Sequence, residues 1–211
     1  MGWEYRVFFQ PRDPVDGSCA HAALRGGRPE SRTDVYRPHT AEVGLKLRGG
    51  SMLELKQRDA VDEVGWENWS KTAGISEQAV LARVPPIAQP LPEVALSKRR
   101  VLAKLRVGGE KVKVEQTDVG VRVGGGGATS SEGAACRTVA IEGKRKLCEA
   151  MRVEILAVCR SMARDGEVHV EGYPSFVHRL AQQSLSQQQQ RVAPLHEALP
   201  LDSDDEYLPT D

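Results

Sequence analysis

Residues 43–58 read Val-Gly-Leu-Lys-Leu-Arg-Gly-Gly-Ser-Met-Leu-Glu-Leu-Lys-Gln-Arg, two alternating runs on either side of a Gly-Gly-Ser turn. Because side chains of a strand alternate between its two faces, this pattern predicts a β-hairpin with one leucine-rich face. The other face carries five ionisable residues with a net charge of +3: Lys46, Arg48, Glu54, Lys56 and Arg58. In one arrangement these charges face water on a half-buried antiparallel sheet. In the other, the sheet closes into a barrel with the charges inside, where cations would bind phosphate.

The same alternation recurs along the chain and predicts about seven or eight strands. Besides the hairpin, we expect strands over residues 3–9, 31–36, 98–107, 111–117, 118–123 and 136–142. Their charged faces carry Glu4, Arg6, Lys104, Arg106, Lys111, Lys113, Glu115 and Glu142. So many strands in one domain, with glutamate beside lysine and arginine on successive strands, favour a closed barrel over a flat sheet.

The remaining segments predict helices and connections. Apolar residues in 143–165 recur at helical spacing, which predicts one long helix packed against the sheet. Ser76 is expected to cap a short helix over 78–83. Residues 62–70 predict a loop or a single helical turn, and a further helical turn is expected from Tyr173. The sequence therefore predicts an α+β domain over residues 1–181, an antiparallel eight-stranded tunnel-like β-barrel with flanking helices and flexible loops at 11–32 and 124–135.

Composition limits the classes of function. The chain has 29 Lys plus Arg and 29 Asp plus Glu, so it has no overall attraction for nucleic acid or an anionic membrane. No apolar run approaches the length that spans a bilayer. Four cysteines without a Cys-x-x-Cys pair indicate free thiols in a reducing compartment. We expect a cytoplasmic protein that binds neither nucleic acid nor membrane. Residues 182–211, glutamine-rich and then acidic, are expected to be disordered, and the acidic part could bind a protein partner.

Six short motifs follow one another along residues 3–181. They are Asp34-Val-Tyr36, Gly44-Leu-Lys-Leu-Arg48, Leu53-Glu-Leu-Lys56, Lys104-x-Arg106, Val139-Ala-Ile-Glu-Gly143 and Gly172-Tyr-Pro-Ser-Phe176. This order resembles that of the CYTH-like family, the triphosphate tunnel metalloenzymes, which includes thiamine-triphosphatases, tripolyphosphatases and class IV adenylyl cyclases. The resemblance implies an eight-stranded tunnel in which lysines and arginines hold a triphosphate or polyphosphate and glutamates hold magnesium or manganese.

The resemblance also implies roles for individual residues. Phosphate ligands would be Arg6, Lys46, Arg48, Lys104, Arg106 and Lys113. Ligands of Mg²⁺ or Mn²⁺ would be Glu4, Glu54, Glu115 and Glu142, and the catalytic residues would be Lys56 and Arg58. Guanidinium and ammonium groups neutralise polyphosphate, and hard cations prefer carboxylate oxygens.

The first strand departs from the family. Members carry Glu-x-Glu-x-Lys there, whereas residues 3–8 of this chain read Trp-Glu-Tyr-Arg-Val-Phe. Half of the acidic pair is missing, which weakens metal binding and puts catalysis in doubt. Three functions stay open: metal-dependent hydrolysis of a triphosphate, binding of a phosphorylated ligand without turnover, and protein interaction through a charged face that is merely solvated.

Overall fold

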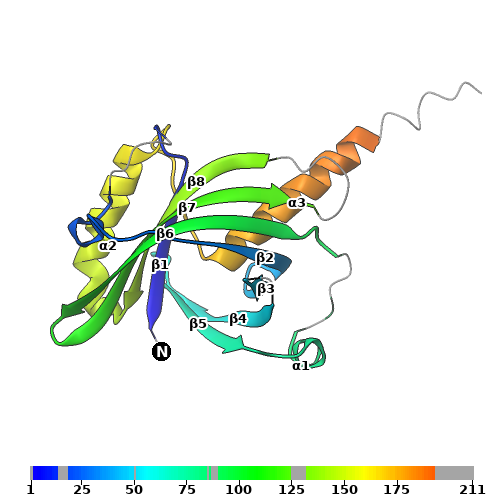
Figure 1. Cartoon of the computed structure of the whole chain (residues 1–211), viewed down its shortest axis with the longest axis horizontal. Helices are drawn as coiled ribbons and strands as arrows, with labels where there is room; N and C mark the ends of the chain where they lie inside the picture. The colour runs from blue at the N-terminus through cyan, green and yellow to red at the C-terminus, as the bar shows by residue number, and fades with distance from the viewer. Residues whose placement is uncertain are drawn as a thin grey trace, which may run out of the picture.

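The computed structural model describes residues 2–13, 19–49, 51–84, 86, 90–124 and 132–192. Eight antiparallel strands close into a barrel (Figure 1). They are β1 (Trp3–Phe9), β2 (Glu30–Thr40), β3 (Val43–Arg48), β4 (Met52–Val61), β5 (Glu67–Ala73), β6 (Val94–Val107), β7 (Glu110–Val123) and β8 (Glu132–Gly143). The sheet order is β5-β4-β3-β2-β6-β7-β8-β1, and Trp3 of β1 pairs with Asn68 of β5 to close the circle. The predicted tunnel-like barrel with flanking helices is therefore confirmed.

The hairpin of β3 and β4 places its charged face inside the barrel. Lys46 pairs with Glu54 across the hairpin, and both side chains line the interior. The leucine face points outward, where Leu53 and Leu55 pack against Val80 of α1 (Glu77–Leu81). The arrangement in which these charges face water on an open sheet is therefore wrong. Closure of the sheet determines whether the charged face lies inside or outside, because a closed sheet turns one face of every strand toward the interior.

Two longer helices pack on different sides of the barrel (Figure 1). The α2 helix (Arg145–Met162) covers the outer face of β1, β7 and β8 and buries Ile155 completely. The α3 helix (Tyr173–Val192) instead packs against the inner face at one end of the barrel. There the ring of Phe176 stacks on Phe8 at 4.2 Å, and Val177 is wholly buried. The interior therefore has an apolar half, filled by α3, and a charged half.

The change from apolar to charged can be followed along β6. Leu96 is buried in the cluster that α3 covers, whereas Lys98 and Arg100, two and four residues further on, line the charged half. The pairing of β2 with β6 ends at Glu30 and Arg100. Beyond that point β6 continues only as a hairpin with β7, whose tip extends past the barrel wall toward α2 (Figure 1).

Several predicted elements need correction. Residues 62–70 were expected to form a loop or a helical turn, but β5 occupies 67–73 and closes the barrel. The strands expected at 111–117 and 118–123 are one strand, β7. The α3 helix continues through the glutamine tract to Val192, so the expected disorder is wrong for residues 182–192. Residues 193–211, with the acidic tail, lie outside the described residues, as do 14–18 and 125–131 within the expected flexible loops.

Other expectations agree with the structure. The predicted long helix is α2, and Ser76 caps α1 by accepting a hydrogen bond from the amide of Ala79. A short strand, β9 (His169–Val170), pairs with β1. All four cysteines are free thiols. None of the helices in the described part of the chain has the length and apolar character that crossing a membrane requires.

Candidate functional site

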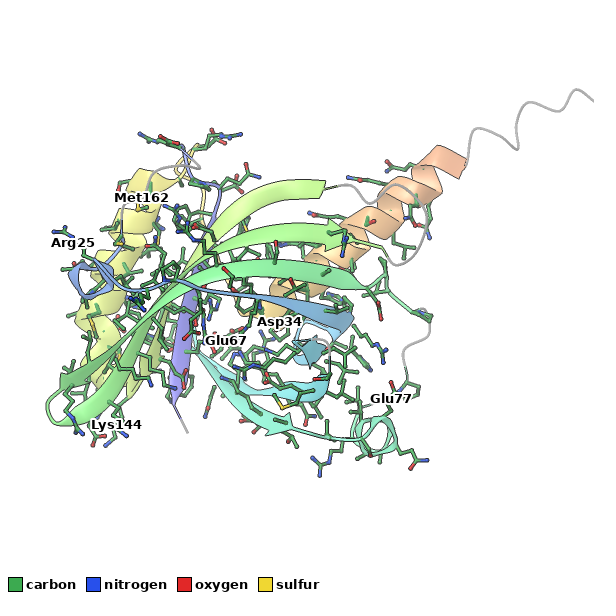
Figure 2. All side chains as sticks on the ribbon, in the orientation of Figure 1. Arg25, Asp34, Glu67, Glu77, Lys144 and Met162 are labelled. Atoms are coloured by element: carbon green, nitrogen blue, oxygen red, sulfur yellow. The ribbon has the colours of Figure 1, made fainter. Side chains whose placement is uncertain are left out.

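A cavity of about 290 Å³ lies in the charged half of the barrel, with Tyr173 and Pro174 of α3 in its wall. Its wall carries nine cationic side chains, Arg6, Arg32, Lys46, Arg48, Lys56, Lys71, Lys98, Arg100 and Lys113. Four carboxylates face the same space, Glu4, Glu54, Glu115 and Glu142. The wall therefore has a formal excess of five positive charges, although the chain as a whole is neutral. In Figure 2, Asp34 lies in the middle of the molecule, between the strands.

Nine of the twelve predicted site residues line this cavity. They are Glu4, Arg6, Lys46, Arg48, Glu54, Lys56, Lys113, Glu115 and Glu142. The side chains come from β1, β3, β4, β7 and β8, so only the closed barrel brings them together. Whether they bind phosphate or metal stays a prediction.

Lys104 and Arg106 do not line the cavity. Both lie on the inward-alternating side of β6, but they follow Arg100, where β2 stops pairing with that strand. Both are exposed, and the guanidinium of Arg106 donates to the carbonyl oxygen of Gly109 at 3.0 Å. The alternation along β6 therefore predicts the correct face of the strand, but β6 continues past the end of the barrel wall.

Arg58 also lies outside the cavity. Its guanidinium donates to a carboxylate oxygen of Glu67 at 3.0 Å and to one of Glu42 at 2.7 Å. Gly44 and Pro174 belong to the cavity wall and pack so closely that a Cβ on Gly44 would lie 2.6 Å from Cγ of Pro174. Lys56 pairs with Gly44, whereas Arg58 lies two residues beyond that pair. In this structure Arg58 therefore forms ion pairs with two carboxylates of the chain itself, those of Glu67 and Glu42.

Sequence reasoning missed four cations of the wall: Arg32, Lys71, Lys98 and Arg100. The signal for Lys98 and Arg100 was present, because both share the alternating face of Lys104 on the same strand. Arg32 falls where the predicted loop 11–32 and the predicted strand 31–36 overlap, and β2 begins at Glu30. Lys71 lies on β5, the strand that was not predicted.

Arg6 stands at the centre of the ion-pair network. Its Nε donates to Glu4 at 3.0 Å, and its Nη1 donates to Glu115 at 3.1 Å and to the hydroxyl of Thr138 at 2.8 Å. Lys56 donates to the second oxygen of Glu4 at 3.0 Å. Burial opposes ionisation of Glu4, but the charges of Lys56 and Arg6 outweigh it and hold the pKa of this carboxyl well below its usual range. The pKa of Glu115 is also lowered, since Arg6 outweighs the effect of burial.

Lys98 forms a second group of contacts at the base of the cavity. Its Nζ donates to Asp34 at 2.9 Å and to the hydroxyl of Tyr36 at 2.7 Å, and it lies 3.7 Å from the centroid of the Tyr173 ring. Burial lowers the pKa of Lys98 to about 7, although Asp34 acts in the opposite direction. Lys98 can therefore exist as an ammonium ion or as a neutral amine near neutral pH.

The remaining cations differ in how they are paired: Arg100 donates to Glu30 at 2.8 Å and to Glu115 at 3.4 Å, and Arg32 is 3.3 Å from Asp34. Lys46 contacts Glu54 at 3.0 Å, and Lys113 contacts Glu142 at 2.9 Å. Arg48 is 3.7 Å from Glu54. Lys71 makes no ion pair with any residue that the structure describes. Lys71 and Lys113 can turn toward a ligand without leaving a buried carboxylate unpaired, since Glu142 is 36% exposed. Glu54, in contrast, is buried and pairs with Lys46.

The predicted metal ligands do not gather around a common point. Glu4 and Glu115 come closest to sharing a cation, but that cation is Arg6. Glu54 and Glu142 face lysines of their own. Across the described residues, no three His, Cys, Asp or Glu side chains form a group that could hold a metal ion. The donor set in this conformation fits a guanidinium better than Mg²⁺, which prefers octahedral oxygen ligands.

A comparison with protein-family models and with curated proteins finds no match to this chain.

Proposed function

We propose that the chain binds the phosphate chain of a small-molecule triphosphate or an inorganic polyphosphate inside its barrel. The observation that carries this proposal is the formal excess of five positive charges among the side chains that line one cavity. The excess is three when Asp34 and Glu30, which pair with Lys98 and Arg100, are included. Carboxylates of the chain pair with most of these cations, and the cations in excess of them lie close together, where like charges repel one another. A polyanion relieves that repulsion and accepts charge-assisted hydrogen bonds from several cations at once.

The size of the cavity limits the part of the ligand that enters it. At about 290 Å³ it lies just below the range of ~300–1,000 Å³ typical of small-molecule sites. Thirteen of the nineteen residues in the wall are charged, and the rings of Tyr36 and Tyr173 with Leu102, Ala140 and Pro174 give it an apolar part. A phosphate chain matches both properties, whereas an aromatic base or thiazole ring would have to remain at the mouth. We therefore expect selectivity for the number of phosphates rather than for the attached organic group.

Thermal denaturation with orthophosphate, diphosphate and tripolyphosphate tests this proposal on the full chain. We expect stabilisation that increases with chain length and reaches about 2.7 kcal/mol at a ligand concentration of about 100 times Kd. Lys46→Met removes one charge-assisted contact and should weaken tripolyphosphate binding by about 10- to 100-fold. Lys104→Met is the matched control, because it removes the same charge outside the cavity. Equal effects of the two variants, or no stabilisation by any of the anions, would contradict the proposal.

Hydrolysis of the bound ligand is a second candidate function, favoured by the position of Lys98. A buried lysine with a pKa of about 7 that also contacts a tyrosine hydroxyl can accept a proton at neutral pH. In the proposed step, a water oxygen bonds to the terminal phosphorus and the water proton passes to neutral Lys98. The anhydride P–O bond breaks, and its electron pair leaves with the shortened phosphate chain, whose charge neighbouring cations stabilise.

Phosphate release from tripolyphosphate separates hydrolysis from binding. Lys98→Arg keeps a positive charge near Asp34 but removes the group that can lose its proton. We expect this variant to bind tripolyphosphate and to release no phosphate, whereas the unmodified chain does both. Turnover by the variant at the rate of the unmodified chain would refute the role of Lys98, and no release by the unmodified chain would leave binding as the function.

The protein-interaction hypothesis loses the feature that motivated it. It required the charged strand faces to be solvated, and nine of the predicted charged residues line the interior of the barrel instead. An interaction through the acidic tail concerns residues outside the described part of the chain.

A further inference from the structure

Arg6 occupies a position between two carboxylates that come from different strands. Its Nε contacts Glu4 of the same strand at 3.0 Å, and its Nη1 contacts Glu115 of β7 at 3.1 Å. Arg6 and Glu115 each pair with Ala140 of β8, one from either side. Because the residue between them is small, the guanidinium can reach across β8 to the carboxylate. The contact is therefore built into the register of three neighbouring strands.

The surroundings of Arg6 hold its guanidinium in place and keep it charged. The side chain is 7% exposed, Thr138 accepts a third hydrogen bond at 2.8 Å, and the guanidinium carbon lies 4.4 Å from the centroid of the Tyr173 ring. Burial would lower the pKa of Arg6, but Glu115 and Glu4 outweigh it and raise the pKa above its usual value. A guanidinium carries its positive charge at every pH in the physiological range.

One donor group of Arg6 remains available. Nε and Nη1 make its hydrogen bonds, whereas Nη2 has no partner among the described residues, and Arg6 lines the cavity. One side of the guanidinium thus neutralises two carboxylates while the other can donate to a phosphate oxygen. A divalent metal in a phosphate site does the same two things, since it binds carboxylates on one side and phosphate oxygens on the other.

We propose that Arg6 takes the place of a divalent metal ion, so that the cavity binds a phosphate chain without magnesium or manganese. This inference rests on the proposed function of the cavity. A metal ion near Glu4 and Glu115 would meet the positive charge of Arg6 and would have to displace two hydrogen bonds of Arg6 to reach both carboxylates. The arginine that interrupts the acidic pair of the first strand is then the residue that supplies the missing charge.

Calorimetric titration of the full chain with tripolyphosphate, in EDTA and in excess Mg²⁺, tests this inference. For the unmodified chain we expect binding in EDTA, with no gain in affinity when Mg²⁺ is added. Tripolyphosphate itself binds Mg²⁺, so the dissociation constants are compared at equal concentrations of free ligand. Binding that requires Mg²⁺ would overturn the inference and leave the proposed function standing. No binding in either condition would overturn both.

Two variants test the role of Arg6 itself. Arg6→Gln removes the bridging cation and should weaken binding in EDTA by about 10- to 100-fold. It leaves Glu4 and Glu115 free to share a divalent ion, so Mg²⁺ should restore much of the lost affinity. Arg48→Gln also removes one guanidinium from the wall, but among the described residues Arg48 forms an ion pair with Glu54 alone, and Mg²⁺ should not rescue that variant. Equal rescue of both variants, or of neither, would contradict the assignment. If Arg6→Gln does not fold, the titration of the unmodified chain still decides.

Discussion

Neutralising Glu4 should destabilise the empty protein and tighten its binding of tripolyphosphate. Glu4 is buried and accepts from Arg6 and from Lys56, each at 3.0 Å. Removing one partner of a buried ion pair costs ~3–5 kcal/mol. The amide of Glu4→Gln can still accept hydrogen bonds, so we expect about 3 kcal/mol. For a chain of this size, that loss lowers the melting temperature by about 6–12 °C.

The gain in affinity follows from the same two contacts. A phosphate oxygen that accepts from Lys56 and Arg6 must lie within about 6 Å of the Glu4 carboxylate, two hydrogen-bond lengths away. At an effective dielectric constant of about 20, the repulsion between unit charges at that distance is about 3 kcal/mol. The neighbouring cations screen part of it, so we expect Glu4→Gln to bind tripolyphosphate about 10- to 100-fold more tightly.

Chemical denaturation and calorimetry of the same samples measure the two effects. Glu142→Gln is the matched control, because Glu142 is 36% exposed and its ion pair within the described part of the chain is with Lys113 alone. It should change the free energy of unfolding by less than about 1 kcal/mol. If Glu4→Gln instead weakened binding in the presence of Mg²⁺, Glu4 would act as a metal ligand, and our reasoning about competition for Arg6 and Lys56 would be refuted.

Three further predictions concern the base of the cavity and its closure by α3. On folding, the pKa of Lys98 falls from 10.5 to about 7, so between these values the unfolded chain holds more protons and the free energy of unfolding rises with pH. Urea titrations across this range should show a smaller rise for Lys98→Met, and an unchanged slope would count against the lowered pKa. Gly44→Ala places a Cβ 2.6 Å from Cγ of Pro174 and should cost ~1–3 kcal/mol; adding Pro174→Ala should recover part of this loss in the same assay. Phe176→Ala removes the ring that stacks on Phe8 and should cost ~3–5 kcal/mol, measured by thermal denaturation; a loss below 1 kcal/mol would mean that α3 does not close the barrel.

The parts of the fold that the sequence predicted depend on local signals. The hairpin of β3 and β4 combines a Gly-Gly-Ser turn with strict alternation, and β1 was predicted with the observed bounds, Trp3–Phe9. In contrast, β5 reads Glu-Asn-Trp-Ser-Lys-Thr-Ala and has no clear apolar face. Its place in the barrel comes from pairing with β4 and β1, a nonlocal contact that alternation does not reveal.

The glutamine tract shows a different kind of error. Its composition suggested disorder, but glutamine is a good helix former, and the helix that begins at Tyr173 can propagate through it. Burial of Phe176 and Val177 against the barrel offsets the free-energy cost of nucleating the helix in its first turns. For a low-complexity segment that follows an anchored helix, helix propensity predicts the structure better than composition does.

The sequence predicted which face of each strand lines the site, but not how far along each strand the site extends. Alternation identified which face of each strand is charged, and nine of twelve predicted residues line the cavity. It could not tell which charges along β6 face the cavity, because that depends on where α3 fills the barrel and where β2 ends. Lys98 and Arg100 lie between these limits, whereas Lys104 and Arg106 lie beyond them.

The most direct test of the central claim is a crystal structure of the full chain with bound tripolyphosphate. Our account predicts the phosphate chain inside the barrel, within hydrogen-bond distance of Lys46, Lys56 and Arg6. Phosphate groups bound only on the outer surface, for example at Lys104 and Arg106 on the tip of the β6–β7 hairpin, would contradict it.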